Sequence, residues 1–335
     1  MSQSYKKSGV DIDAGAKAVA LMRDAVRATY TPSVLSDVGN FGGLFSLKSI
    51  ATMSNPVLVA STDGVGTKTK VASMMNRWDT IGADLVNHCI NDILVQGATP
   101  LFFLDYVASD KLDPQQIADI VTGMATACQA SQTALLGGET AEMAGVYQSG
   151  EVDVVGTIVG AVDQDHVIDG STIQEGDTII ALPSTGLHTN GFTLARAVLA
   201  EEDWQNQHSE LGQSIGEALL ATHRCYLQEF LKIREQVDIR GIAHITGGGI
   251  TDNLPRILPD GLGATIDTSK WKIPAIFQMI ENMGDVSSAE MYRVFNMGLG
   301  MLIVVSQTDA DMVLDLLDDG FIVGEIVQGD GVQIV

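Results

Sequence analysis

The sequence predicts an α+β fold, with helices layered on sheets, in two domains. Runs of apolar and β-branched residues alternate with long helix-like segments, an order typical of layered α/β domains. A polar segment at residues 163–177 lies between two predicted strands and separates the halves. The length of 335 residues is enough for two domains of ordinary size. We expect an N-terminal sheet domain at 1–168 and a C-terminal α+β domain at 169–335.

The elements of the N-terminal half follow from apolar runs and helix-start signals. Consecutive apolar and β-branched residues favour strands. Asp113 is a typical N-cap, and Pro114 suits the first helical position. In chain order we expect a helix at 13–30, a glycine-rich loop at 31–54, a strand at 56–62, a helix at 80–96, a strand at 100–108, a helix at 113–131, a short strand at 133–136 and a strand at 152–163.

The same reasoning gives the elements of the C-terminal half. We expect strands at 177–183, 263–267, 300–306 and 321–327. We expect helices at 189–201, 211–236, 251–258 and 275–282. The sequence shows no internal repeat and no low-complexity tract.

The charge restricts the partners. Forty-two acidic residues face 19 basic ones, for a formal net charge of −23. Such a chain repels nucleic acid and anionic membranes, so we expect neither as a partner. A phosphate-bearing substrate would also be repelled, so its site must supply compensation from metal ions, backbone N–H groups or a few cations. A soluble, acidic surface explains most of the charge.

Membrane insertion and export are not expected. The sequence has no run of about 18 apolar residues, and no apolar core follows the lysines near its start. Cys89, Cys128 and Cys225 are far apart and stand in apolar surroundings. This pattern predicts buried free thiols in a reducing compartment, so we expect a cytoplasmic protein.

The segment Ser61–Lys70, STDGVGTKTK, has the composition of a phosphate site. It lacks the glycine that a Walker A loop places before its lysine, and Thr69 stands where a dinucleotide loop has its third glycine. What remains is Asp63 at a strand end, followed by a flexible loop with Lys68. Asp63 would hold Mg²⁺ and Lys68 would meet a phosphate oxygen. A tight glycine turn with a solvated lysine explains this stretch equally well.

The predicted helix at 80–96 favours the functional interpretation. A polar stripe at helical spacing contains no Lys, Arg or Glu, the residues that usually fill an exposed helix face. Short carboxylates and amides suit metal or ligand coordination better than bulk solvent. The stripe consists of Asp84, Asn87, His88, Asn91 and Asp92.

The segment Leu135–Tyr147, LLGGETAEMAGVY, is more ambiguous. Its glycine pair would let the backbone approach a ligand closely. Glu139 and Glu142 lie one helical turn apart if a helix starts here, and they could bind metal or act as acid and base. Acidic residues that match the dipole of a helix N-terminus are the simpler explanation of this segment alone.

Two glycine-rich segments of the second half contain polar residues. STGLHTNG, Ser184–Gly191, places His188 and Asn190 in a loop after a strand, where loops often carry function. HITGGGITDN, His244–Asn253, has three glycines before a predicted helix capped by Thr251 or Asp252, which suits an anion site. A flexible connector is the alternative.

Other residues are expected to have ordinary roles. His166, His208 and His223 are interpreted as surface or helix residues. FNMGLGM, Phe295–Met301, is interpreted as a structural turn that enters a strand.

Seven ordered segments together resemble one family, and the resemblance spans almost the whole chain. They are similar to motifs of phosphoribosylformylglycinamidine cyclo-ligase, also called aminoimidazole ribonucleotide synthetase. The segments are GVDIDAG (Gly9–Gly15), TDGVGTK (Thr62–Lys68), NDILVQGA (Asn91–Ala98), LFFLDY (Leu101–Tyr106), GGETAEM (Gly137–Met143), HITGGG (His244–Gly249) and EMYRVFNMGLGM (Glu290–Met301).

The resemblance implies an activity and partners. Such enzymes use ATP to close the imidazole ring of formylglycinamidine ribonucleotide, giving aminoimidazole ribonucleotide, ADP and phosphate. The implied fold has an N-terminal sheet domain that binds ATP and Mg²⁺ and forms a homodimer, and a C-terminal domain that completes the active site. A requirement for K⁺ stays open.

The resemblance also implies roles for individual residues. Asp63 and Asp92 would hold Mg²⁺, with Glu139 as a further ligand, and Lys68 would meet ATP phosphates. Three residues would face the ribonucleotide or act on it, namely His188, Asn190 and Thr246. The remaining expected ATP contacts are Asp13, Gly15, Gly64, Gly66, Thr67, Gly137 and Gly138.

Departures and alternatives are few. Leu187 and Thr189 replace proline and serine, and His88 stands where another residue type is expected, so His88 is left out of the catalytic set.

The alternatives are the synthetase of the preceding purine step, thiamine-monophosphate kinase, selenide kinase, or a nucleotide-binding protein that has lost its chemistry. The GGETAEM and HITGGG segments favour the cyclo-ligase.

Overall fold

The computed structural model describes residue 9 and residues 11–335. The described chain divides into two units. The first contains residues up to 93 together with 98–165, and the second contains 94–97 together with 166–335. Within the described residues, no helix is both long and apolar enough to cross a membrane.

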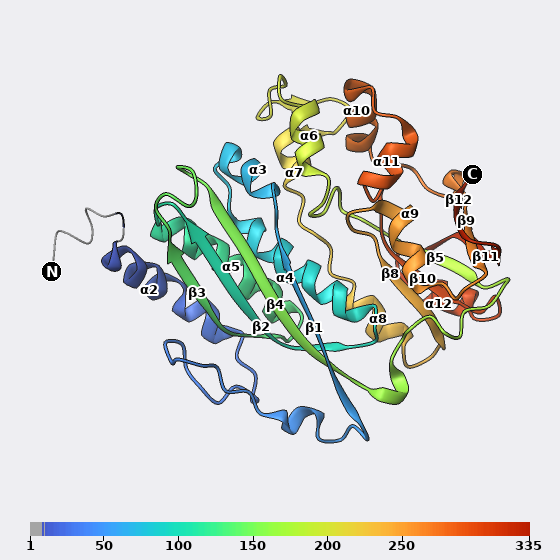
Figure 1. Cartoon of the computed structure of the whole chain (residues 1–335), viewed down its shortest axis with the longest axis horizontal. Coiled ribbons are helices and arrows are strands. Elements are labelled where there is room, and N and C mark those ends of the chain that lie inside the picture. Colours follow the sequence, from blue (N-terminus) through green and yellow to red (C-terminus); the bar gives the residue numbers. More distant parts are fainter. Residues whose placement is uncertain (1–8, 10) are drawn as a thin grey trace. The chain divides into compact units, whose positions relative to one another are not determined.

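The first unit is built on a sheet with strand order β1–β4–β2–β3 (Figure 1). Neighbouring strands are antiparallel except β2 and β3, which are parallel. The strands are β1 (Pro56–Gly64), β2 (Thr99–Ser109), β3 (Ala134–Glu142) and β4 (Val152–Asp163). The helical segments are α2 (Ile12–Ala28), η1 (Leu47–Ile50), α3 (Lys68–Met75), α4 (Asp79–Leu94) and α5 (Pro114–Ala130).

Helices α4 and α5 cover one face of this sheet (Figure 1). On β4, buried residues alternate with partly exposed ones, as expected of a strand with one face in the core. A Cβ on Gly82 of α4 would meet the Ile120 carbonyl oxygen at 1.9 Å, and a Cβ on Gly123 of α5 would meet the Asp79 carbonyl oxygen at 2.4 Å. The two helices therefore pack with their backbones in contact.

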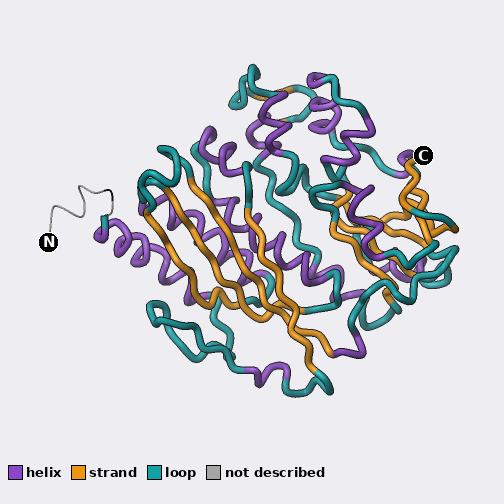
Figure 2. The backbone as a smooth tube through the Cα atoms, in the orientation of Figure 1, coloured by secondary structure: helices purple, strands orange, loops and turns teal. Residues whose placement is uncertain are grey.

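The other face of the sheet is partly open. Leu58 of β1 is 57% exposed and Leu104 of β2 is 37% exposed. At one end of this face, Ile50 packs with Leu101 and Ala161. Ile50 belongs to the connection between α2 and β1, which Figure 2 shows as a long loop interrupted by η1.

The second unit contains a sheet with strand order β12–β9–β11–β5–β10–β8. Its strands are antiparallel to their neighbours except β12 and β9, which are parallel. The strands are β5 (Thr178–Pro183), β8 (Ile239–His244), β9 (Leu262–Ile266), β10 (Leu299–Val305), β11 (Phe321–Gln328) and β12 (Gly331–Ile334), and a small ribbon is formed by β6 (Gln207–His208) and β7 (Gln213–Ser214).

Short helices pack around this second sheet. Every residue of β10 is buried, which explains its uninterrupted apolar sequence. The helices are α6 (Phe192–Val198), α7 (Ile215–Leu219), α8 (Leu227–Ile233), α9 (Gly249–Asn253), η3 (Leu254–Ile257), η4 (Thr268–Lys270), α10 (Ala275–Gly284), α11 (Ser288–Val294) and α12 (Ala310–Leu316), and η2 (Gln164–His166) lies at the boundary of the two units.

The predicted α+β class is confirmed, and most expected elements are present. Asp113 caps α5 by accepting hydrogen bonds from the next turn, and Pro114 is the first helical residue, as predicted. The expected helix over 211–236 is wrong. A capping box at Ser214 and Glu217 starts α7, which ends at Leu219, and α8 begins only after an extended segment.

Two other expectations are also wrong. The segment with Glu139 and Glu142 continues strand β3 and does not start a helix, because it pairs with β2 as far as Ser109. Helix α9 starts at Gly249 with Gly248 as N-cap, so neither Thr251 nor Asp252 caps it. Strands β8 and β12 and helices α3, α11 and α12 were not predicted.

Candidate active site

A cluster of polar side chains lies where β1 ends and α4 passes over it. His88 Nε2 is 2.7 Å from Asp63 Oδ2 and 3.6 Å from Asp92 Oδ2. Ser61 donates a hydrogen bond of 3.0 Å to Asp92. One ligand atom each from Asp63, His88 and Asp92 lie within 4.8 Å of one another. The structure thus brings together the two predicted carboxylates and adds a histidine that was left out.

Burial and charge act against each other in this cluster. Burial alone would raise the pKa of Asp63, but the hydrogen bond and charge of His88 outweigh it and lower that pKa. Burial favours the neutral His88 ring, but the hydrogen bond to Asp63 and the charge of Asp92 raise the pKa of His88. The cluster therefore favours charged carboxylates beside a cation.

Lys68 does not extend into solvent. It is the first residue of α3, its side chain is fully buried, and its Nζ lies 2.8 Å from Asp84 Oδ2. The Asp84 side chain is fully buried as well. Burial lowers the pKa of Lys68, and the charge of Asp84 opposes this shift. The solvated lysine considered from the sequence is therefore wrong.

The glycine segment between Asp63 and Lys68 forms a turn from strand to helix. The Gly64 N–H donates 2.7 Å to Asp63 Oδ1. Gly66 has φ +66°, a conformation that favours glycine, and no atom lies within 4 Å of where its Cβ would be. Thr67 is exposed and precedes the first turn of α3. The segment between Asp63 and Lys68 is thus a turn that leads into α3, and phosphate binding there stays a prediction.

Glu139 lies apart from the carboxylates of β1. Strands β4 and β2 separate β3 from β1, and Glu139 pairs with Tyr106. With strands about 4.8 Å apart, three strand spacings separate Glu139 from β1. Glu139 is exposed and is not part of the cluster around Asp63.

The glycine pair beside Glu139 accommodates a partly buried acid. A Cβ on Gly138 would meet Asp105 Oδ1 at 2.1 Å, whereas a Cβ on Gly137 would have only ordinary contact with Leu104. Burial and, to a lesser extent, the charge of Glu139 raise the pKa of Asp105 to about 7. A carboxyl with such a pKa is common at functional sites.

The start of the GVDIDAG segment is hydrogen-bonded to strand β3, the strand that also contains Glu139. Asp11 caps α2, and its backbone N–H donates to the carboxylate of Glu142. Glu142 also accepts a 3.0 Å hydrogen bond from the N–H of Leu112. Glu142 thus connects the start of α2 to the end of β3. Asp13 is exposed and Gly15 is half-buried in the first turns of α2, while Val10 of this motif lies outside the described residues.

In the second unit, His188 occupies a strained, buried position. Its φ is +62°, and only 1% of the residue is exposed. The ring of His223 stacks on it with the ring centres 3.9 Å apart. His223 is also 1% exposed, so its interpretation as an ordinary surface or helix residue is wrong.

The glycine loop of the second unit is held by an amide. Asn253 Nδ2 donates to the backbone carbonyls of Thr246, Gly247 and Gly249, and Thr246 Oγ1 donates to Asn253 Oδ1. The position of a Gly247 Cβ would be 3.1 Å from Asn190 Oδ1. The two predicted substrate-facing segments therefore lie side by side, and the loop is not a loose connector.

A pocket of about 780 Å³ opens beside this loop. Bare glycine backbone forms part of its wall, and the one guanidinium in the lining, Arg293, lies 3.6 Å from Asp252, with Glu290 as a second lining carboxylate. The bare backbone N–H groups are the feature of this pocket that suits an anionic group. The lining residues are Gly191, Gly247, Gly248, Asp252, Ala289, Glu290, Arg293 and Val294.

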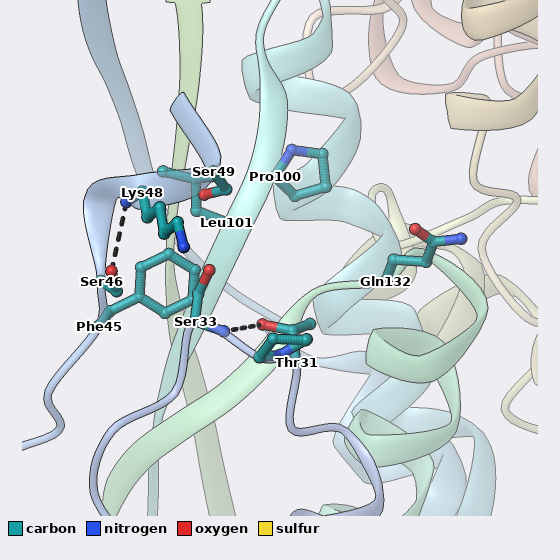
Figure 3. Close-up of a pocket in the computed structure, with 10 residues that line it drawn as sticks. Thr31, Ser33, Phe45, Ser46, Lys48, Ser49, Pro100, Leu101 and Gln132 are labelled. Atoms are coloured by element: carbon teal, nitrogen blue, oxygen red, sulfur yellow. Dashed lines mark hydrogen bonds between the residues drawn. The ribbon is translucent and has the colours of Figure 1, made fainter. Parts of the chain in front are cut away.

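The first unit has a smaller pocket of about 480 Å³ near the start of β2. Figure 3 shows Phe45 and Lys48 on one side of it and Gln132 on the other. No predicted site residue, all of which the structure describes, lines this pocket. The lining residues are Thr31, Pro32, Ser33, Phe45, Ser46, Lys48, Ser49, Pro100, Leu101 and Gln132.

Several residues of these sites were not selected from the sequence. Asp84 and His88 belonged to the predicted polar stripe, and their spacing of four residues places them on one face of α4. That spacing was the signal that could have found them. Asp105 and His244 follow apolar residues and His223 stands between Thr222 and Arg224, and only the fold brings the three near their polar partners.

Comparisons with known proteins cover nearly the whole chain. Residues 48–162 match the family described as AIR synthase related protein, N-terminal domain, and residues 174–335 match its C-terminal domain. A phosphoribosylformylglycinamidine cyclo-ligase of Desulfitobacterium hafniense (strain DSM 10664 / DCB-2) is 50% identical over 338 residues, which cover 99% of both chains. A protein of the same name from Alkaliphilus metalliredigens is 46% identical, over 97% of this chain and 96% of the relative.

Solved structures share the fold at low sequence identity. Thiamine-monophosphate kinase from Stenotrophomonas maltophilia K279a has a TM-score of 0.68 and 19% identity, over 95% of each chain. Hydrogenase maturation protein HypE in complex with ATP has a TM-score of 0.67 and 15% identity, over 94% of this chain and 86% of that one.

Proposed function

The chain belongs to the AIR synthase related family and is a phosphoribosylformylglycinamidine cyclo-ligase, and we propose that Asp63 and Asp92 bind the Mg²⁺ of its ATP. The enzyme uses ATP to close the ring of formylglycinamidine ribonucleotide in purine biosynthesis. The observation that carries the proposed metal site is the group of donor atoms within 4.8 Å at the end of β1.

The donor set suits Mg²⁺. Two carboxylates and the hydroxyl of Ser61 offer hard oxygen ligands, and one or two carboxylates leave room for water and phosphate oxygens around the ion. The imidazole of His88 is a poorer ligand for this ion. We assign His88 the role of orienting Asp63 and Asp92, since its Nε2 lies between their oxygens.

The start of α3 is the proposed phosphate site. The turn at Gly64–Thr67 leads into this helix, whose first N–H groups and dipole favour an anion. Lys68 faces Asp84 in the interior, so the phosphates of ATP would meet the backbone and Thr67. Contact with the Lys68 ammonium requires that its ion pair with Asp84 open.

The second unit supplies the proposed ribonucleotide site. Its pocket has bare backbone at Gly247 and Gly248, which suits a phosphate group, and Arg293 can add to this once it leaves its ion pair with Asp252. Asn190 and Thr246 lie next to this backbone and can direct the rest of the substrate. His188 belongs to the same loop as Asn190.

The reaction needs positioning and charge neutralisation more than covalent chemistry by the protein. The γ-phosphoryl group of ATP passes to the formyl amide oxygen, and ADP leaves. The amidine nitrogen then attacks the activated carbon and loses a proton, and phosphate departs with the former amide oxygen. Asp63 and Asp92 would hold Mg²⁺, which would supply neutralisation of phosphate charge when bound.

The open face of the first sheet is the proposed homodimer contact. Leu58 and Leu104 are exposed there, and Thr62 and Thr157 form a hydrogen bond of 2.8 Å between β1 and β4. An exposed apolar sheet face is a common protein contact surface. A second copy of the chain would cover it.

One assay tests the activity. ADP and aminoimidazole ribonucleotide are measured together, with ATP present and formylglycinamidine ribonucleotide either present or omitted. We expect equal amounts of both products, and little ADP when the ribonucleotide is omitted. ADP formation that does not depend on the ribonucleotide would contradict the cyclo-ligase function and favour a kinase. Repeating the assay with Na⁺ in place of K⁺ tests a potassium requirement.

A further inference from the structure

Three histidines of the second unit form a buried group. His188 and His223 are each 1% exposed, and His244 is 7% exposed. They come from the loop after β5, the extended segment before α8, and the end of β8. Buried histidines cost free energy unless their ring nitrogens are hydrogen-bonded, so this group needs an explanation.

His223 connects the other two rings. Its ring stacks on His188 at 3.9 Å between centres, with 23° between the planes. Its Nε2 lies 3.1 Å from His244 Nε2. Its Nδ1 lies 3.4 Å from Thr189 Oγ1. One face and both nitrogen edges of His223 are thus used, which a residue that merely fills space does not require.

The contacts restrict where the ring protons are. The backbone N–H of Thr185 lies 3.2 Å from His188 Nε2 and can only donate, so this nitrogen carries a lone pair and the neutral ring has its proton on Nδ1. Between His223 and His244, one Nε2 must carry a proton and the other must accept it. The tautomer of His244 therefore depends on that of His223.

The surroundings leave these rings little freedom. A Cβ on Gly300 would meet Tyr226 Oη at 1.8 Å and His188 Cε1 at 2.8 Å. Tyr226 itself is anchored by a 2.9 Å hydrogen bond to the carbonyl of Pro183. Gly300, in the segment interpreted from the sequence as only a structural turn, therefore makes room for the ring of His188.

We propose that His223 is a positioning residue of the ring-closure reaction, which fixes the ring plane of His188 and the ring-proton position of His244. His188 is two residues from Asn190, and His244 is two residues from Thr246, so the two rings are directly connected through the backbone to residues of the proposed ribonucleotide site. This proposal rests on that assignment of the second unit. Loss of the His223 contacts would misplace groups that must meet the substrate.

Three variants of the full chain test the proposal. His223→Gln keeps an amide near the Nε2 position and can still bond to His244. His223→Phe keeps a flat ring against His188 but has no polar atom. His166→Phe is the matched control, because His166 is exposed in the same unit. For each variant, kcat and KM for both substrates, the thermal unfolding midpoint, and the ¹⁵N shifts of the histidine rings are measured.

We expect His223→Phe to lower kcat by about 10- to 100-fold, with KM for ATP changed by less than about twofold. The ring shifts of His244 should change, His223→Gln should restore most of kcat, and His166→Phe should behave as the parent. The proposal is overturned if His223→Phe keeps the parent kcat, if the His244 shifts do not change, or if both His223 variants lose activity only in step with thermal stability. Absence of product from the parent enzyme would contradict the cyclo-ligase function instead, and the ring shifts would still decide whether His223 sets the tautomer of His244.

Discussion

Lys68 and Asp84 form an ion pair in which both side chains are fully buried, with Nζ and Oδ2 2.8 Å apart. The pair joins the first residue of α3 to the middle of α4, the two helices that flank the proposed metal and phosphate sites. The negative charge of Asp84 compensates the Lys68 ammonium, which explains how the lysine of the TDGVGTK segment can be buried.

Removal of one partner of this pair should be costly. Asp84→Leu or Lys68→Met leaves a buried charge without its counter-ion, and each should lower the free energy of unfolding by about 3–5 kcal/mol. The double variant should recover most of that loss. Urea denaturation of the three variants measures the free energy of unfolding. A loss in the double variant equal to the sum of the two single losses would contradict the coupling. If Lys68 also contacts ATP, the stable double variant will still have a raised KM for ATP.

Asp92→Asn should remove most activity while the protein stays folded. The amide keeps the size of the side chain but loses the charge that the proposed Mg²⁺ needs. We expect kcat/KM to fall by about 100-fold or more, with partial recovery at high Mg²⁺. Product formation is measured against Mg²⁺ concentration, and circular dichroism checks the fold. Asp165→Asn, on an exposed residue, is the control. Near-parent activity would remove Asp92 from the metal site.

Glu139→Gln tests whether this residue is a further ligand of the same ion. Two strands lie between β3 and β1, so we expect the apparent Mg²⁺ requirement to rise much less than in Asp92→Asn. The measurement is the same Mg²⁺ titration of product formation. Equal effects of the two variants would show that Glu139 meets the ion in the working enzyme despite this separation.

Asp105 should make stability depend on pH. Burial raises the pKa of its carboxyl from 3.8 to about 7, so folding favours the protonated form. This contribution is complete below pH 3.8 and is lost as pH rises through about 7. Relative to Asp105→Asn, the parent should lose up to about 1.4 kcal/mol per pH unit in this range. Denaturant unfolding of both proteins from pH 4 to 8 checks this, and a pH-independent difference would refute it.

Leu104→Glu should disrupt the proposed dimer. The new carboxylate would stand on the open sheet face and would have to be desolvated on association. We expect a dimer for the parent and a monomer for the variant by size-exclusion chromatography with light scattering. Leu21→Glu, at an exposed residue of α2, is the matched control. A dimeric Leu104→Glu variant would place the subunit contact elsewhere.

The parts of the fold that could be predicted are those specified by neighbouring residues. Asp113 and Pro114 define the start of α5 locally, and the apolar run of β4 gives the strand its observed bounds. The segment with Glu139 and Glu142 has helix-like spacing, but pairing with β2 makes it a strand. Such pairing joins residues far apart in the chain, and a local pattern does not contain it.

The residues of the candidate site also fall into those that a local sequence signal indicates and those that depend on distant segments. Asp63 and Asp92 stood out because a carboxylate at a strand end and a polar helix stripe are local signals. The burial of Lys68 and the stacking of His223 on His188 depend on side chains brought from other segments. A histidine between Thr222 and Arg224 carries no mark of burial in its own sequence.

The glycine contact between α4 and α5 has a consequence for genetics. Gly82 and Gly123 bring the two backbones together, and Asp84, His88 and Asp92 lie on α4 within three turns of that contact. A methyl group at position 123 would push against the Asp79 carbonyl and displace these three side chains together. Loss-of-function alleles should therefore arise in α5, at a residue with no side chain, and the resulting purine requirement should be relieved by compensating changes on α4.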